Sequence, residues 1–281
     1  MEENEGKIGS LYVVATPIGN LGDLSIRAAN TLRDVSFIAA EDTRVTLKLL
    51  NHLGLKKPMI SCYRHNEDDR VDIIVSRILS GEDCALCCDA GTPAISDPGE
   101  NIVAAATEAG IRVIPIPGPS AVIAALSSSG LVSGRFCFEG FIPMNKKTRK
   151  NRLLSLQNEK RTMVFYEAPH KLRRTLIDFY EYFGNRDMVI ARELTKIYEE
   201  IIHTTIKDAI SLYSEHEPKG EFVLILKGLD EEVSEEPTLE DAVLLAKTYL
   251  QDGLSSSEAA KKASKETGQT RSLVYKGMIG D

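Results

Sequence analysis

The segment Leu11-Tyr-Val-Val-Ala-Thr-Pro-Ile-Gly-Asn-Leu-Gly-Asp23 joins a short apolar run to a loop of turn-forming residues. The apolar run at 11–15 predicts a buried β-strand, and the loop predicts where that strand ends. An amphipathic helix is predicted next, at 24–33, and a second apolar strand at 35–39. A strand, a helix and a strand at this spacing are typical of an α/β fold, in which helices cover a parallel sheet.

The same alternation continues to residue 117. Further strands are predicted at 59–62, 84–88 and 111–116, and helices at 43–53, 70–79 and 100–109. We therefore expect an N-terminal α/β domain at 8–117 with a parallel-rich sheet.

The pattern changes after residue 117. Two predicted strands, 188–193 and 199–204, are close enough along the chain to pair as antiparallel neighbours. We expect a second α/β domain at 118–229 with a mixed sheet. The acidic, proline-containing stretch 229–240 is interpreted as a linker, and 238–281 as a small helical appendage.

The composition is that of an ordinary globular protein. The chain has 281 residues, of which 43% are hydrophobic, and a net charge of −7 from 34 basic and 41 acidic residues. No apolar run is long enough to span a membrane, and the acidic start at 1–7 does not resemble a secretory signal. These features predict a cytoplasmic protein without a membrane partner.

The cysteines are predicted to be buried, reduced thiols. Cys84, Cys87 and Cys88 lie in one apolar strand, and no second pair or nearby histidine completes a zinc site. We therefore expect no metal.

Polar or glycine- and proline-rich loops follow five successive predicted strands, where parallel sheets bind ligands. These loops are 16–23, 41–44, 63–67, 89–99 and 117–120. Each has a purely structural alternative: a turn at 16–23, for example, or a domain hinge at 117–120. The chain has no G-x-G-x-x-G after the first strand, no G-x-x-x-x-G-K-[ST] and no G-x-S-x-G, so NAD, ATP and serine-hydrolase chemistry have no support.

Taken together, the loop motifs resemble those of the tetrapyrrole methylase superfamily. Within it they resemble the bacterial enzymes that methylate a ribose 2′-oxygen of small-subunit ribosomal RNA. The resemblance rests on 11–23, 39–44, 65–67, 89–93, 117–120, 135–143, 165–170, 192–196, 199–200 and 219–223, so it covers nearly the whole chain.

The resemblance implies a tetrapyrrole-methylase-like fold of two α/β domains, with S-adenosylmethionine bound between them and no metal. It further implies a homodimer whose target is a cytidine ribose in the decoding region of 16S rRNA, reached either as RNA or as the small ribosomal subunit. The cofactor contacts that it implies are Pro17, Ile18, Gly91, Thr92, Pro93, Ile95, Ser120, Ala121, Tyr166, Glu167 and Gly220.

The reaction itself limits which residues can act as catalysts. A sulfonium methyl group is already electrophilic, so the protein must supply in-line positioning and remove the proton of a ribose hydroxyl. The candidate bases are Glu41, Asp42, Glu67, Glu193 and Lys196. Asp42 or Lys196 is favoured as the base, with Arg44 positioning the substrate. The alternative is that Arg44 forms a structural ion pair with Glu41 or Asp42.

A basic stretch on this acidic chain predicts phosphate contacts. It contains Lys146, Lys147, Arg149, Lys150 and Arg152 and no acidic residue. A solvated helix start is the alternative. The segment 258–275 is interpreted as a helix, a glycine turn and a helix, which either grips RNA or packs on a dimer.

Two other functions stay open at this point. One is a methyltransferase that acts on a tetrapyrrole, and the other is a non-enzymatic ribosome-assembly factor that keeps only the fold. The basic stretch and the loop at 41–44 favour an RNA substrate.

Overall fold

The computed structural model describes residues 8–63, 67–229 and 237–280, with only the backbone described at 67–69. Most of the predicted linker at 229–240 therefore lies outside the described residues, and so do the motif residues His65 and Asn66. The chain forms two compact units, Met1–Leu229 and Asp230–Asp281, and each is described here by itself.

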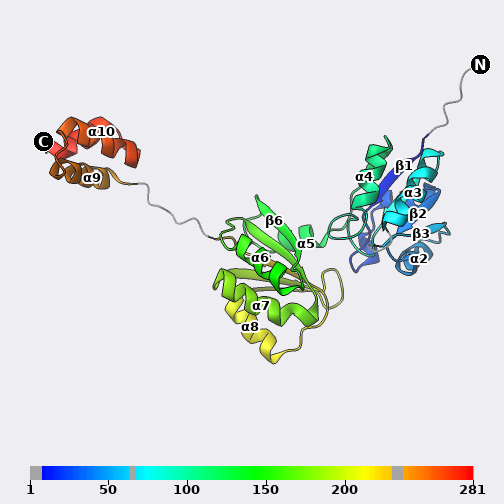
Figure 1. Cartoon of the computed structure of the whole chain (residues 1–281). Helices are drawn as coiled ribbons and strands as arrows, with labels where there is room; N and C mark the ends of the chain where they lie inside the picture. Colours follow the sequence, from blue (N-terminus) through cyan, green and yellow to red (C-terminus); the bar gives the residue numbers. More distant parts are fainter. Residues whose placement is uncertain (1–7, 64–66, 230–236, 281) are drawn as a thin grey trace, which may run out of the picture. The chain divides into compact units, whose positions relative to one another are not determined.

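The first sheet of the larger unit is entirely parallel (Figure 1). Its order is β3-β2-β4-β1-β5, so β1 lies between β4 and β5. The strands are β1 (Ser10–Val14), β2 (Phe37–Ala40), β3 (Met59–Ser61), β4 (Cys84–Cys87) and β5 (Arg112–Ile116). The predicted parallel sheet is confirmed.

Helices cover both faces of this sheet. They are α1 (Ile26–Asp34), α2 (Thr43–His52), α3 (Glu67–Leu79) and α4 (Glu100–Glu108), and a short 3-10 turn, η1 (Leu21–Asp23), follows β1. Side chains of α3 and α4 pack on one face, and those of α1 and α2 on the other. Cys84 and Cys87 of β4 point into these cores, and Cys88 is also buried, so the prediction of buried thiols is confirmed.

The second sheet is mixed, with the order β6-β7-β10-β8-β9. Only β6 and β7 pair in parallel, and the other neighbours are antiparallel. The strands are β6 (Phe136–Phe141), β7 (Thr162–Glu167), β8 (Asp187–Arg192), β9 (Glu200–Thr205) and β10 (Phe222–Leu226). The predicted antiparallel pairing of β8 with β9 is confirmed, and Ile190 lies opposite Ile202.

The helices of this second part divide between the two faces of its sheet. One face is covered by α6 (Lys146–Leu156), α7 (Pro169–Phe183) and α8 (Ile206–Glu215). The other is covered by α5 (Ala121–Ser128), whose Val122 and Leu126 pack on strand residues such as Val164 and Val189. The last strand, β10, lies between β7 and β8, so residues from distant parts of the chain meet at its ends.

The smaller unit is a bundle of α9 (Leu239–Gln251), α10 (Ser256–Thr267) and α11 (Arg271–Ile279). Its core is made of small residues around Val274. Capping boxes begin α9 at Thr238 and α10 at Ser255, and Gly268 ends α10 in the left-handed region, with φ of 72°. The predicted helix, glycine turn and helix are confirmed. None of the helices in the described ranges is long and apolar enough to cross a membrane.

Candidate active site

A cavity of about 380 Å³ lies in the larger unit, a size usual for small-molecule sites. One side is formed by loops that follow strands of the first sheet, including Gly91 after β4 and Ser120 before α5. The other side comes from the second sheet, with Tyr166 at the end of β7 and Val223 in β10. The cavity is therefore built from the strand ends of both sheets.

The cavity brings together eight of the eleven residues predicted to contact the cofactor. These are Ile18, Gly91, Thr92, Ile95, Ser120, Ala121, Tyr166 and Glu167. Pro17 and Pro93 are chain neighbours of lining residues, and Gly220 precedes the lining residue Glu221. Gly91 has a φ of +85°, a conformation that favours glycine.

Several lining residues were not predicted from the sequence. They are Ala90, Asp97, Phe141, Ala168, Pro169, Ala191, Leu194, Glu221, Phe222 and Val223. Asp97 and Glu221 lie within loops whose motifs are visible in the sequence, at 89–99 and 219–223, so motif position was a usable guide for these two. Phe141 also lies within a motif, at 135–143, whereas Ala191, in β8, lies outside the motifs and had no such guide.

The lining of the cavity is acidic. Among the described residues that form it, three are carboxylic acids, Asp97, Glu167 and Glu221, and none is Lys, Arg or His. Burial raises the pKa of the Tyr166 phenol to about 12, so that side chain stays neutral at physiological pH. This wall suits a cationic ligand and disfavours a phosphate.

Glu167 is held rigidly in the wall. Only 3% of the residue is exposed, and its two oxygens accept hydrogen bonds from the Thr175 hydroxyl at 2.5 Å and the Ala168 N–H at 2.8 Å. Behind Thr175, Arg149 donates to the Thr175 hydroxyl at 2.9 Å and pairs with Asp178 at 2.5 Å. A buried network thus links α6 and α7 to the cavity.

This network separates Arg149 from the other residues of the predicted phosphate-binding stretch. The Arg149 side chain is 5% exposed, so its guanidinium is not available at the surface. Lys146, Lys147 and Lys150 are exposed at the start of α6, and Arg152 pairs with Glu139 while staying nearly half exposed. The stretch is therefore a helix start, capped by Asn145, with one basic residue turned inward.

The acidic loop after β2 is bound to the end of β4. The Asp42 N–H donates to the Asp89 carboxylate at 3.0 Å, and the Asp89 N–H donates to Glu41 at 3.1 Å. Arg44 grips the Asp42 carboxylate with Nε and Nη2, and these hydrogen bonds lower the pKa of Asp42 to about 2. Asp42 also caps α2 through the Arg44 N–H. Glu41, Asp42 and Arg44 lie outside the lining of the cavity.

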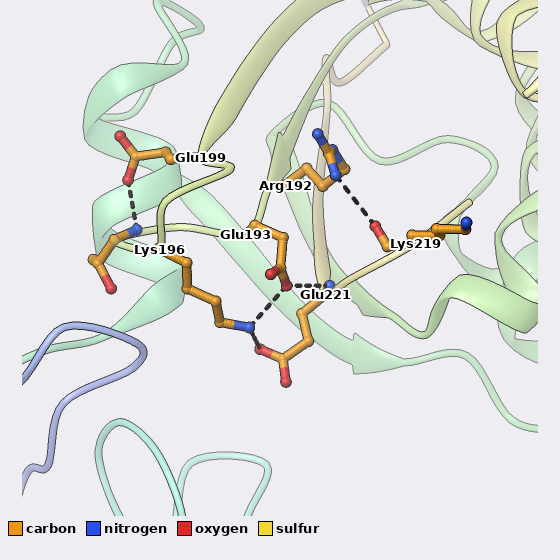
Figure 2. Close-up of polar contacts among 7 residues, drawn as sticks. Arg192, Glu193, Lys196, Glu199, Lys219 and Glu221 are labelled. Atoms are coloured by element: carbon orange, nitrogen blue, oxygen red, sulfur yellow. Dashed lines mark hydrogen bonds and ion pairs between the residues drawn. The ribbon is translucent and has the colours of Figure 1, made fainter. Parts of the chain in front are cut away.

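Lys196 lies in a cluster of carboxylates (Figure 2), one of which, Glu221, lines the cavity. Its ammonium donates to Glu193 Oε1 at 2.8 Å and to Glu221 Oε2 at 3.1 Å. Burial by itself lowers the pKa of Lys196, but the two carboxylates outweigh it, and the pKa is raised. The Lys196 hydrogen bond lowers the pKa of Glu193. The cluster is therefore a cation held between two anions. The side chain of Glu67, another candidate base, is outside what the structure describes.

A glycine allows the first sheet's loop to approach this cluster. A Cβ at Gly19 would lie 2.6 Å from Lys196 Cγ and 2.8 Å from the Thr195 hydroxyl. The loop that it meets is strained, because Glu193 and Thr195 have φ values of +50° and +66°, which L-residues rarely adopt. Strain of this kind concentrates at functional sites.

Within the described ranges, no group of three or more His, Cys, Asp or Glu residues is arranged to hold a metal ion.

Comparison with known proteins identifies the family. The family model of Tetrapyrrole (Corrin/Porphyrin) Methylases matches residues 10–210. Among solved structures, a diphthine synthase shares the fold with a TM-score of 0.62 at 13% identity, over 78% of this chain and 90% of that one. A Thermus thermophilus uroporphyrin-III C-methyltransferase complexed with S-adenyl homocysteine has a TM-score of 0.57 at 14% identity, over 78% and 97%.

Closer relatives narrow the group. A Xylella fastidiosa protein named ribosomal RNA small subunit methyltransferase I is 48% identical over 96% of this chain and 98% of its own length. A Bacillus subtilis protein of the same name is 42% identical over 95% and 93%. The chain is a methyltransferase and belongs to the tetrapyrrole methylase family. Within that family it belongs to the group whose members are named ribosomal RNA small subunit methyltransferase I. The predicted family and fold are confirmed.

Proposed function

We propose that this protein transfers a methyl group from S-adenosylmethionine to the 2′-oxygen of a cytidine ribose in the decoding region of 16S rRNA. The observation that carries the proposal is the acidic cavity at the strand ends of both sheets, in a chain 48% identical to a named ribosomal RNA methyltransferase.

The cavity fits S-adenosylmethionine in charge and in shape. The cofactor carries a sulfonium and an ammonium, and Asp97, Glu167 and Glu221 supply negative charge around them. The apolar walls, including Ile18 and Ile95, suit a planar adenine, and Gly91 allows its backbone to approach a ligand closely. When bound, the cofactor supplies an electrophilic methyl group, so no metal is required. Pro17, Pro93 and Gly220, which adjoin lining residues along the chain, are proposed to shape the loops that contact the cofactor.

The RNA would be held outside the cavity by exposed cations. We propose Lys146, Lys147, Lys150 and Arg152 as phosphate contacts and omit Arg149 because it is buried. Arg44 is 87% exposed, and Asp42 fixes its guanidinium, so the pair can orient an RNA phosphate while Glu41 fixes the loop. In this arrangement Asp42 and Arg44 position the substrate.

We also propose that the protein acts as a homodimer in the cytoplasm. Ile197 and Tyr198, large apolar side chains beside Lys196, are strongly exposed in the chain and suit burial against a second copy or an RNA base. Light scattering of the purified protein tests the dimer by its mass.

Methyl transfer to small ribosomal subunits that lack the modification tests the function. We expect label from S-adenosylmethionine on one decoding-region cytidine, resistant to alkaline cleavage on its 3′ side because the 2′-oxygen is blocked. Tight cofactor binding with no RNA label, and label on a tetrapyrrole, would support the alternative small-molecule methyltransferase. RNA binding without any cofactor binding would support an assembly factor.

A further inference from the structure

Glu221 is fixed in the cavity wall by two residues that do not line the cavity. Its backbone N–H donates to Glu193 Oε1 at 2.9 Å, and the Glu193 N–H donates back to the Glu221 carbonyl at 3.0 Å. Its side chain accepts from Lys196 Nζ at 3.1 Å. Glu193 therefore fixes the main chain of Glu221, and Lys196 fixes its carboxylate (Figure 2).

Lys196 and Glu193 cannot easily take a proton themselves. Lys196 is already protonated, because it contacts two carboxylates and its pKa is raised. Glu193 Oε1 receives two hydrogen bonds, and its pKa is lowered, which makes it a weaker base. Glu221 remains: its side chain is 78% exposed, and its Oε1 is free of the contact that Lys196 makes with Oε2.

The other wall and loop carboxylates are less suited to the same role. Both oxygens of Glu167 are used by Thr175 and Ala168. Asp42 is gripped by Arg44 and lies outside the cavity lining. Asp97 lines the cavity and is the direct competitor of Glu221, so the experiment below includes it.

We propose that Glu221 is the general base that accepts the proton of the acceptor hydroxyl, and that Lys196 and Glu193 are its positioning residues. The inference rests on the proposed function, since it needs a hydroxyl acceptor. The acceptor oxygen forms a bond to the methyl carbon while the carbon–sulfur bond breaks. That bond's electron pair stays on sulfur, which becomes a neutral thioether, and the hydroxyl proton moves to Glu221. Glu221 then releases the proton to water.

The timing of the proton transfer explains why a carboxylate suffices. A ribose hydroxyl is a far weaker acid than a carboxylic acid, so Glu221 does not ionise it in advance. It takes the proton as the carbon–oxygen bond forms and the hydroxyl becomes acidic, which is general-base catalysis worth about 10²–10⁴-fold in rate. Lys196 aims the Glu221 carboxylate, and a cation there also favours negative charge developing on the acceptor oxygen.

Single-turnover methyl transfer to small ribosomal subunits, measured from pH 4.5 to 9, tests the assignment in the full-length protein. We expect Glu221→Gln to slow the step about 100-fold or more and to flatten the acid side of the pH profile. Its dissociation constant for S-adenosylhomocysteine should change less than about 5-fold, and Asp97→Asn should keep the acid-side titration. Lys196→Met should slow the step about 10-fold while the dissociation constant for S-adenosylhomocysteine changes less than about 5-fold, because the Glu221 carboxylate loses the cation that aims it, and Lys196→Arg should restore the rate.

Each contrary result has a distinct meaning. Wild-type protein that binds cofactor but leaves RNA unlabelled overturns the proposed function, and the inference with it. Wild-type activity retained within 3-fold by a folded Glu221→Gln overturns only the role of Glu221. An acid-side titration lost in Asp97→Asn but kept in Glu221→Gln assigns the base to Asp97 instead. A methyl-transfer rate within 3-fold of wild type in a folded Lys196→Met removes Lys196 as a positioning residue.

Discussion

The carboxylate of Glu193 occupies the space that a side chain at Gly220 would need. A Cβ at position 220 would lie 2.5 Å from Glu193 Cγ and 2.7 Å from its Oε1, and Gly220 has a φ of +90°. Glu193 in turn holds the Lys196 ammonium and the Glu221 backbone. The glycine at position 220 thus leaves the room that Glu193 needs in order to bind Lys196 and Glu221.

Gly220→Ala is therefore expected to displace Glu193 and to reduce methyl transfer by at least 10-fold. Gly184→Ala is a matched control, since Gly184 also has a positive φ, of +72°, but its Cβ would meet nothing within 4 Å. Both variants should lose about 1–3 kcal/mol of stability from backbone strain. Methyl-transfer rates and urea unfolding distinguish the two effects, and an equal loss of rate in both variants would argue against displacement of Glu193.

Arg149→Ala is expected to destabilise the fold, but the folded variant should bind RNA as tightly as wild type. Removing the guanidinium leaves the mostly buried Asp178 with only its longer contact to Arg174, at 3.9 Å, and leaves Thr175 without a donor, at a cost of about 3 kcal/mol. The exposed Lys150→Ala should instead leave stability within about 0.5 kcal/mol of wild type. Urea unfolding and RNA titration of both variants check this. An Arg149→Ala variant that keeps its stability but binds RNA more weakly would show that Arg149 is one of the phosphate contacts.

Replacing Lys146, Lys147 and Lys150 together by Ala is expected to weaken RNA binding and to reduce its salt dependence. Each lost phosphate contact should lower the slope of log K against log salt by about 0.7–0.9, because fewer counterions are released. Binding to small-subunit RNA at 50–300 mM salt measures the slope. Lys207→Ala, in the exposed start of α8, is the control and should leave the slope unchanged. An unchanged slope in the triple variant would favour the solvated helix start.

The Asp42–Arg44 pair predicts a pH-dependent contribution to stability. Arg44 lowers the pKa of Asp42 to about 2 in the folded protein, below its ordinary value of 3.8. The contribution is therefore fully present above about pH 5 and is lost as the pH falls from about 4 toward 2, where the unfolded carboxylate binds the proton first. The difference in free energy of unfolding between wild type and Asp42→Asn should shrink over that range. A difference that grows as the pH falls would contradict this pairing.

Local sequence patterns were enough for the elements and for the loops of the cavity. Alternating apolar strands and amphipathic helices predicted the parallel first sheet and the loops at its strand ends, whereas the eight predicted cofactor residues that line one cavity came from the family resemblance. This worked because strand ends of a parallel sheet meet at one edge, so the loops that follow successive strands are close in space. The inward turn of Arg149 also has a local basis, since Arg149, Leu153 and Leu156 share one face of α6 and are all buried.

The sequence by itself thus determined the α/β class, the strands, the helices and the loops that form the cavity, because these depend on residues close along the chain. Only the tertiary structure decided which charges meet. Glu221 reaches Lys196, 25 residues away, because β10 pairs with β8, with Phe222 opposite Arg192. No local periodicity encodes that pairing, since it depends on the final strand being inserted between two earlier ones, where burial of both its faces is most favourable.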